Sequence, residues 1–181
     1  MRVLRTRTRI DSAFVQLLRR RPYADIRVSD ITRKASVGRA TFYAHYAAKD
    51  DLLRSQFERI VAPMLIACPH DPSVLDASRF FAHIRSAPQF YRALMGPNGG
   101  TAPRILRDCF EARARQTLAL NYGGTNGLKL SAVPRFVGAS LIAITECWFE
   151  QGGRETPQQM QAFFADLVSP GLARIRRTPG R

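Results

Sequence analysis

Apolar residues recur at helical spacing along nearly the whole chain, and no segment shows the sustained alternation that marks a strand. The first predicted helix runs from about Arg5 to Arg20, and Pro22 ends it. Two short helices follow, and a fourth begins near Lys49 and runs toward Pro63, which we expect to kink or end it. The pattern therefore predicts an all-α fold.

A second set of helices follows a change in composition, and we place the domain boundary within residues 55–72. The predicted organisation is an N-terminal three-helix domain over residues 1–55 and a helical domain over residues 56–181. Two helix starts are marked by local signals, Asp71-Pro72 as N-cap plus first-turn proline, and Thr156-Pro157-Gln158-Gln159 as a capping box. Further helices are predicted over residues 89–95, 102–120 and 131–151, and the last helix is expected to end before Pro170.

The most informative segment is residues 28–46, where two short helices are joined by a tight turn. Ser36 and Gly38 flank this turn, and the second helix begins at Arg39 with arginine, threonine, tyrosine and histidine on its outer side. Such groups suit phosphates and base edges, whereas a catalytic motif would gather carboxylates, a nucleophile or metal ligands. The pattern predicts a helix-turn-helix, whose second helix can lie in a DNA major groove.

This segment resembles the TetR family of bacterial transcription regulators, over roughly residues 5–60. The positions that match the family signature in fixed register are Ala35, Val37, Thr41, Phe42, Tyr43, His45, Tyr46, Lys49, Asp50, Asp51, Leu52 and Leu53. One departure falls in the turn, because the family usually has glycine where this chain has Ser36, and serine where it has Gly38. A serine in a left-handed conformation costs about 1 kcal/mol, so the departure concerns the shape of the turn.

The resemblance implies that the DNA contacts come from Arg39, Thr41, Tyr43, His45 and Lys49. To these we add Ser29 in the preceding helix. Arginine can pair with a guanine edge, and threonine can meet a base or a thymine methyl. Tyr43, His45 and Lys49 are expected at phosphates. The intervening Ala40, Phe42 and Ala44 are expected on a buried side. Three arginines of the first helix either reach phosphate or the minor groove or form a solvated arm, namely Arg5, Arg7 and Arg9.

Charge is concentrated in the same part of the chain. The net charge is +14, and residues 1–54 contain 13 of the 28 basic residues but only 5 of the 14 acidic ones. An arginine-rich genome explains the choice of arginine over lysine, but it does not explain the excess of bases over acids. The distribution favours a module that contacts phosphates.

Composition and missing motifs exclude several other classes of protein. With 45% hydrophobic and 23% charged residues, the chain is typical of a soluble globular protein. We see no apolar run of the roughly 18 residues that a membrane span needs and no signal peptide, so we expect a cytoplasmic protein. The three cysteines, Cys68, Cys109 and Cys147, are odd in number and widely spaced, which favours a reduced compartment. Cys109 and Cys147 are expected in the core. No catalytic, metal-binding or cofactor motif is present, so we expect no enzyme, metal or cofactor.

The resemblance also implies a C-terminal domain that encloses a small-molecule pocket and dimerises through its last two helices. The candidates for the pocket wall are Phe81, Met95, Phe110 and Trp148. The last two helices are apolar over more than one face, and the candidates for the dimer interface are Phe136, Ile142, Phe163 and Leu167. Residues 90–96 and 147–153 are similar to a subgroup that regulates dihydroxyacetone kinase genes, in which some members activate transcription with a protein co-regulator.

These observations predict a homodimeric repressor that binds a double-stranded DNA operator and that a small-molecule effector releases. An effector would change the separation of the two recognition helices, which must lie about 34–36 Å apart to bind. Activation with a co-regulator stays open. Two other classes also stay open: a small helical enzyme, which would need polar residues converging in the C-terminal core, and a basic protein that binds nucleic acid or membrane surfaces without specificity.

Overall fold

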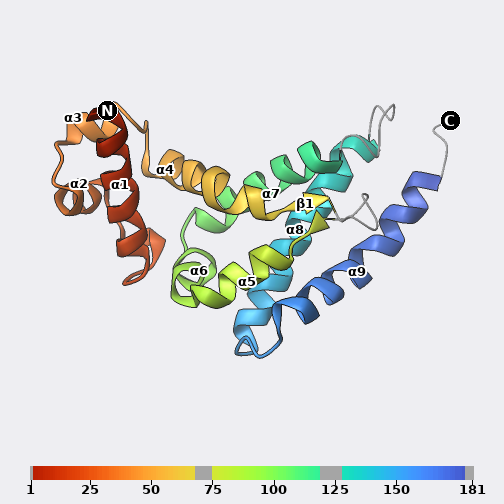
Figure 1. Cartoon of the computed structure of the whole chain (residues 1–181). Coiled ribbons are helices and arrows are strands. Elements are labelled where there is room, and N and C mark those ends of the chain that lie inside the picture. Colours follow the sequence, from red (N-terminus) through yellow and green to blue (C-terminus); the bar gives the residue numbers. More distant parts are fainter. Residues whose placement is uncertain (1, 68–74, 119–127, 178–181) are drawn as a thin grey trace. The chain divides into compact units, whose positions relative to one another are not determined.

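The computed structural model describes residues 2–67, 75–118 and 128–177, and within them the chain is almost entirely helical (Figure 1). The longer helices are α1 (Arg2–Leu18), α2 (Val28–Ala35), α3 (Arg39–Tyr43), α4 (Lys49–Gln56), α5 (Ser78–Ser86), α6 (Pro88–Met95), α7 (Ala102–Leu118), α8 (Leu128–Glu150) and α9 (Pro157–Arg177). Short helical turns are η1 (Tyr23–Asp25), η2 (Phe57–Val61) and η3 (Ala62–Met64). The strands β1 (Ile66–Ala67) and β2 (Leu75–Asp76) form one antiparallel pair. The all-α prediction is confirmed.

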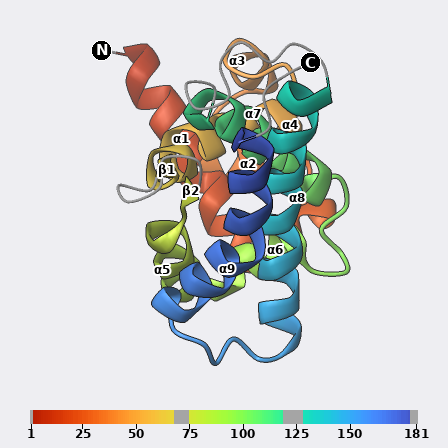
Figure 2. The same cartoon turned by 90° about the vertical axis from the view of Figure 1, so that its right-hand side faces the viewer.

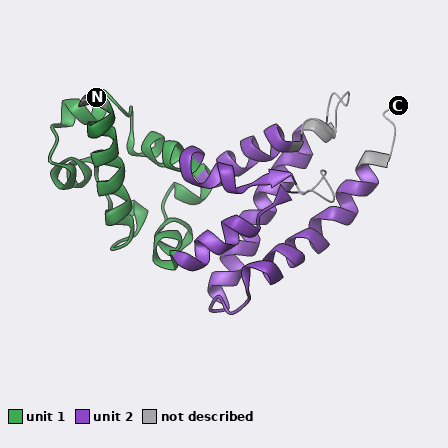
Figure 3. Ribbon diagram, viewed as in Figure 1, with its two compact units in different colours: residues 1–57, 87–105 green, residues 58–86, 106–181 purple. Residues whose placement is uncertain are grey.

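The chain forms two compact units (Figure 3). The first contains residues 1–57 and 87–105, and the second contains residues 58–86 and 106–181. Helix α6 therefore belongs to the first unit, where it packs against α1. The loop after α6 also contacts this unit, since the Ala24 amide donates to the Asn98 carbonyl over 3.4 Å. The sequence pattern predicts one domain over residues 56–181 and does not predict that residues 87–105 belong to the first unit.

Helix α1 provides the core of the first unit. It buries Ile10, Phe14 and Leu18, each 1% exposed or less, and it packs most extensively against α2. The helix begins at Arg2 and ends at Leu18, whereas the sequence pattern placed it from Arg5 to Arg20. Beyond Leu18 the chain continues as a turn, in which the Arg19 amide donates to the Val15 carbonyl at 3.2 Å and the Arg21 amide to the Leu17 carbonyl at 3.1 Å.

In the second unit α9 packs on both α5 and α8 (Figure 2). The side chain of Gln161 joins α9 to the segment before α5, because its Oε1 accepts from the Ala77 amide at 2.7 Å and its Nε2 donates to the Leu75 carbonyl at 3.2 Å. The predicted capping box at the start of α9 is confirmed. The Thr156 amide donates to Gln159 Oε1 at 2.8 Å, and the Gln159 amide donates to Thr156 Oγ1 at 3.2 Å.

Helices α7 and α8 approach each other closely at Gly138. A Cβ atom at this position would lie 2.8 Å from the Glu111 amide nitrogen and 3.2 Å from the Phe110 carbonyl carbon. Because both atoms belong to backbone, neither can swing aside. The absence of a side chain at Gly138 is therefore what allows the two helices to cross at this distance.

Three expectations about the second half are wrong. Helix α9 does not end before Pro170 but continues to Arg177, which is tolerated because Pro170 lies on the exposed side, where water can reach the carbonyl that the proline leaves without a donor. The β1–β2 pair was missed because strands of two residues are too short to show alternation. The helix expected from Asp71 begins at Ser78 as α5, and the predicted cap at Asp71-Pro72 lies outside the described residues.

Helix α8 also contains a stretch that the sequence analysis did not recognise. Residues Ser131–Glu150 have a mean hydropathy of 1.2, and by length and composition they are apolar enough to cross a membrane. Half of this stretch is buried within the protein, as is common for a core helix of a globular unit.

Candidate nucleic-acid interface

Helix α2 packs on α1, and α3 packs on α2, with a few buried apolar side chains in the two helices. Ile31 and Ala35 of α2 are buried, and Phe42 of α3 is completely buried. The Phe42 ring also meets the ring of Tyr46 at 5.8 Å between centroids. Because α3 has only this one buried anchor, its orientation depends strongly on the turn that precedes it.

Helix α2 ends at a residue in the left-handed backbone conformation, Ser36. Ser36 adopts φ 50° and ψ 53°, and it is the only non-glycine residue with a positive φ in the described part of the chain. Its amide donates to the Arg33 carbonyl at 3.2 Å, and the Val37 amide donates to the Thr32 carbonyl at 3.0 Å. Gly38 is the N-cap of α3. The left-handed serine considered in the sequence analysis is confirmed.

The outer surface of α3 carries Arg39, Thr41 and Tyr43, all exposed, with Tyr43 at 48%. The expected division into a buried side and a reading side is wrong for two positions. Ala40 and Ala44 are exposed, because alternating residues do not share a face of a helix with 3.6 residues per turn. Phe42 is the position that is buried.

His45 lies beyond the end of α3. It follows the last helical residue, Tyr43, by two positions, and its side chain is half-buried beside the ring of Tyr46, at 6.4 Å between centroids. The sequence pattern placed His45 on the recognition helix itself. The structure instead places it in the connection to α4.

Lys49 makes contacts that the sequence analysis did not foresee. Its Nζ donates to the carbonyls of Tyr23 and Ile26, both at 2.7 Å, and lies 3.9 Å from the centre of the Tyr23 ring. Burial lowers the pKa of this ammonium, while the nearby Asp50 opposes that shift. Two of the three donors of this ammonium are therefore bound to the carbonyls of Tyr23 and Ile26, whereas the sequence analysis expected the side chain at phosphate. The phenol of Tyr23 in turn donates to Asp50, so the start of α4 is held to η1 from both sides.

Arg7 and Arg9 of α1 are exposed, but each also donates hydrogen bonds to protein oxygens. Arg7 donates through Nε to the Tyr46 hydroxyl at 3.1 Å and through Nη2 to Ser55 Oγ at 2.8 Å. The Tyr46 hydroxyl itself donates to the buried carboxylate of Asp11 at 2.7 Å. Arg9 donates to the Ser36 carbonyl at 2.9 Å. The alternatives considered from sequence, a DNA-binding arm or a solvated arm, did not include this structural use.

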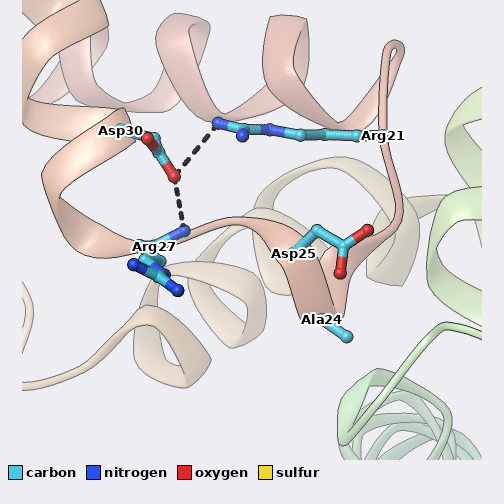
Figure 4. Close-up of a pocket in the computed structure, with 5 residues that line it drawn as sticks. All are labelled: Arg21, Ala24, Asp25, Arg27 and Asp30. Atoms are coloured by element: carbon cyan, nitrogen blue, oxygen red, sulfur yellow. Dashed lines mark hydrogen bonds and ion pairs between the residues drawn. The ribbon is translucent and has the colours of Figure 1, made fainter.

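A polar hollow of about 410 Å³ lies beside the start of α2 (Figure 4). Asp30 there accepts from the Arg27 amide at 2.9 Å and pairs with the Arg21 guanidinium at 3.1 Å, and the Arg27 hydrogen bond is the main reason that its pKa is lowered. Ser29 is half-exposed in the first turn of this helix. Asp25 also lines the hollow, so the hollow contains both acidic and basic side chains and does not have the uniform positive charge that suits an anion.

Sequence reasoning missed the exposed cations beside this hollow and at the other end of α2. Arg27 is the exposed N-cap residue of α2, and Arg33 and Lys34 are exposed in its last turn. The position of Arg27 immediately before the predicted helix was the signal that could have found it. These cations flank the helix-turn-helix and add positive charge near α3.

The candidates for an effector pocket lie in the core. Phe81 and Phe110 are completely buried, Trp148 is 4% exposed and Met95 is 7% exposed. The rings of Phe81 and Trp148 pack edge to face, with their centres 6.1 Å apart. Met95 belongs to α6 in the first unit, whereas the three aromatic residues belong to the second unit.

The candidates for a dimer interface divide in the same way. Phe136, Phe163 and Leu167 are 52%, 52% and 55% exposed, whereas Ile142 is 1% exposed. Ile142 is therefore a core residue of its own chain, and we remove it from the candidates for the dimer interface. Cys147 is also corrected, because it is exposed on α8 rather than buried like Cys109. Within the described residues no cluster of three or more potential metal ligands occurs, and Cys68 lies outside them.

A strained helix-turn-helix with an exposed, polar second helix, joined to a second helical unit, defines a DNA-binding protein of the helix-turn-helix class. The family model for bacterial regulatory proteins of the tetR family matches residues 10–55, which cover α2, the turn and α3. Within these residues the chain is therefore similar to the bacterial regulatory proteins of the tetR family.

Individual relatives agree with this assignment. An uncharacterized HTH-type transcriptional regulator, YxbF of Bacillus subtilis (strain 168), is 39% identical over 174 residues, which are 92% of this chain and 45% of YxbF, so the chain spans less than half of that relative. A TetR transcriptional regulator from Streptococcus agalactiae 2603V has a TM-score of 0.65 and 21% identity, covering 92% of this chain and 95% of its own. The dihydroxyacetone kinase operon activator DhaS has a TM-score of 0.58 and 19% identity, covering 93% and 96%. At such identities these two structures support the fold alone.

Proposed function

We propose that this chain is a cytoplasmic, dimeric repressor that recognises a specific operator through α3 and is released by a small molecule. The observation that carries the proposal is the arrangement of α3, which exposes Arg39 and Thr41 while Phe42 anchors it. Residues 1–55 act as the DNA-binding domain and residues 56–181 as the effector and dimerisation domain. Arg39 and Thr41 read base edges, whereas Ser29, Tyr43 and His45 contact phosphates.

The test of operator specificity compares two duplexes at physiological salt. One carries the promoter region of the chain's own gene, and the other carries the same bases in scrambled order. A specific regulator binds the first at least about 1,000-fold more tightly. Equal affinity for both duplexes would instead identify a basic protein that binds nucleic acid without specificity.

The dimer is supported by an exposed apolar surface, which we define as Phe136 of α8 with Phe163 and Leu167 of α9. All three side chains are more than half exposed although they are large and apolar. Helices α8 and α9 pack side by side in the second unit. A second copy of the chain would cover this apolar surface and set the spacing of the two α3 helices.

An effector site is supported by the indole of Trp148. Its Nε1 is buried, with no hydrogen-bond partner in the described part of the chain, and such a donor costs about 1–3 kcal/mol. We place Phe81, Phe110 and Trp148 at the effector and leave out Met95. A thermal-shift screen of small oxygen-containing compounds tests this, with Trp148→Phe as the matched variant that keeps a ring and removes the N–H. Hits should raise the melting temperature of the wild type and lose most of that effect in Trp148→Phe.

Activation is the second candidate for the sign of regulation. It is favoured by the fold shared with DhaS, which is described as an operon activator. A reporter gene placed behind the bound promoter separates the two signs. Repression predicts higher reporter output when the gene for this chain is deleted, and activation predicts lower output.

A further inference from the structure

Ser36 holds the backbone shape that aims the recognition helix, and it does so at an energetic disadvantage. Its φ of 50° lies in the left-handed region, which an L-residue with a side chain adopts only with steric strain. Only Ser36 and Val37 lie between Ala35, the last residue of α2, and Gly38, the N-cap of α3. A small rotation at Ser36 would therefore change the direction in which α3 leaves.

One side chain from another helix stabilises this turn. The Arg9 guanidinium of α1 donates to the Ser36 carbonyl at 2.9 Å, a contact between residues 27 positions apart. The carbonyl belongs to the residue just after the end of α2, where helix carbonyls carry partial negative charge, so a cation is favourable there. A hydrogen bond from a charged donor is also stronger than one between neutral groups.

We propose that Arg9 is a positioning residue, which fixes the left-handed turn at Ser36 and thereby the aim of α3 on DNA. The alternative for an exposed arginine beside a DNA-binding motif is direct contact with phosphate. Arg9 and Ser36 border an open polar groove of about 260 Å³ between α1 and the end of α2, together with Lys34. This surface position makes the alternative real, so the experiment must distinguish the two roles.

The experiment is a double-mutant cycle between Arg9→Ala and Ser36→Gly in the full chain. Affinity is measured for the operator that the wild type selects from randomised duplexes, and for a scrambled duplex, at several salt concentrations. Glycine adopts the left-handed turn without strain, so it removes the need for the Arg9 contact. We expect Arg9→Ala to weaken operator binding about tenfold in the serine background, and about threefold or less in the glycine background. The salt slope should stay unchanged, and the ratio of operator to scrambled affinity should fall.

Arg5→Ala is the matched control, because Arg5 is exposed on the same helix one turn earlier. Its effect on binding should be the same whether residue 36 is serine or glycine. Circular dichroism on each variant checks that the helices remain folded. The salt slopes of affinity are compared among the variants that remain folded. An equal loss for Arg9→Ala in both backgrounds, with the slope reduced by about 0.9, would show a phosphate contact and overturn the proposal. No loss in the serine background would overturn it as well.

Discussion

At the scale of single residues, the basic side chains of the first unit fall into two groups. Some donate hydrogen bonds to protein oxygens, and others are exposed. Arg7, Arg9 and Lys49 each donate at least one hydrogen bond to a protein oxygen, at Tyr46, Ser36 and the carbonyls of residues 23 and 26. Arg39 and Lys34 are exposed. The charge of a DNA-binding module therefore overstates the number of its phosphate contacts, because part of that charge holds the motif together.

Replacing Lys49 by methionine tests this division. The substitution keeps a long side chain but removes the donors for two carbonyls, and we expect a loss of about 1–3 kcal/mol in the free energy of unfolding. Operator binding should weaken without a change in salt slope. Lys34→Met is the control, and as an exposed lysine it should change stability by no more than about 0.5 kcal/mol. A salt slope lowered by about 0.9 in Lys49→Met, with normal stability, would return Lys49 to the phosphate contacts.

At the scale of elements, helix types could be predicted from sequence more completely than their ends or their partners. The capping box at Thr156 marked the start of α9 because its two hydrogen bonds are local. The continuation of α9 past Pro170 could not be predicted, since it depends on which side of the helix faces solvent. The return of α6 to the first unit rests on contacts with residues far away in sequence, which periodicity does not encode.

The recognition site shows the same limit. Phe42 and the strained Ser36 could be predicted, because one is apolar and the other departs from a family glycine. The hydrogen bonds of Lys49 and Arg9 to backbone carbonyls could not be predicted, because a basic side chain beside a helix-turn-helix has the same sequence signature whether it meets phosphate or a carbonyl.

The crossing of α7 and α8 gives a prediction at the element scale. Gly138→Ala should lower the free energy of unfolding by about 1–3 kcal/mol, because its Cβ would lie 2.8 Å from the Glu111 amide nitrogen and force the helices apart. Gly171→Ala is the matched control on α9, where an added Cβ meets nothing within 4 Å. It should be neutral or stabilise by up to about 1 kcal/mol, since alanine favours helix. Urea unfolding of both variants measures the difference, and equal effects would contradict the close crossing.

At the scale of the whole molecule, the second unit leaves large apolar side chains in solvent. Phe136, Phe163 and Leu167 are more exposed than large apolar residues of a folded unit usually are. Polar substitution at this apolar surface should separate copies of the chain without unfolding it. Substitution at Ile142, which is buried in its own chain, should unfold it instead.

Sedimentation of three variants at micromolar concentration measures this. Phe163→Glu should be a monomer with normal helical content. Ile142→Glu should lose helical content or aggregate, because an unpaired buried charge is strongly destabilising. Gln158→Glu, at an exposed polar position of α9, should remain a dimer like the wild type. A wild-type chain that sediments as a monomer would contradict the proposed dimer directly.

The central claim is that α3 reads DNA sequence, and selection of bound sites from randomised duplexes by the wild type and by Arg39→Ala tests it most directly. The wild type should enrich a pseudo-palindrome. Arg39→Ala should lose preference at one base pair of each half-site and bind about 1–3 kcal/mol more weakly. Unchanged base preference with uniformly lower affinity would make Arg39 a phosphate contact, and a wild type that enriches no sequence at all would contradict the account.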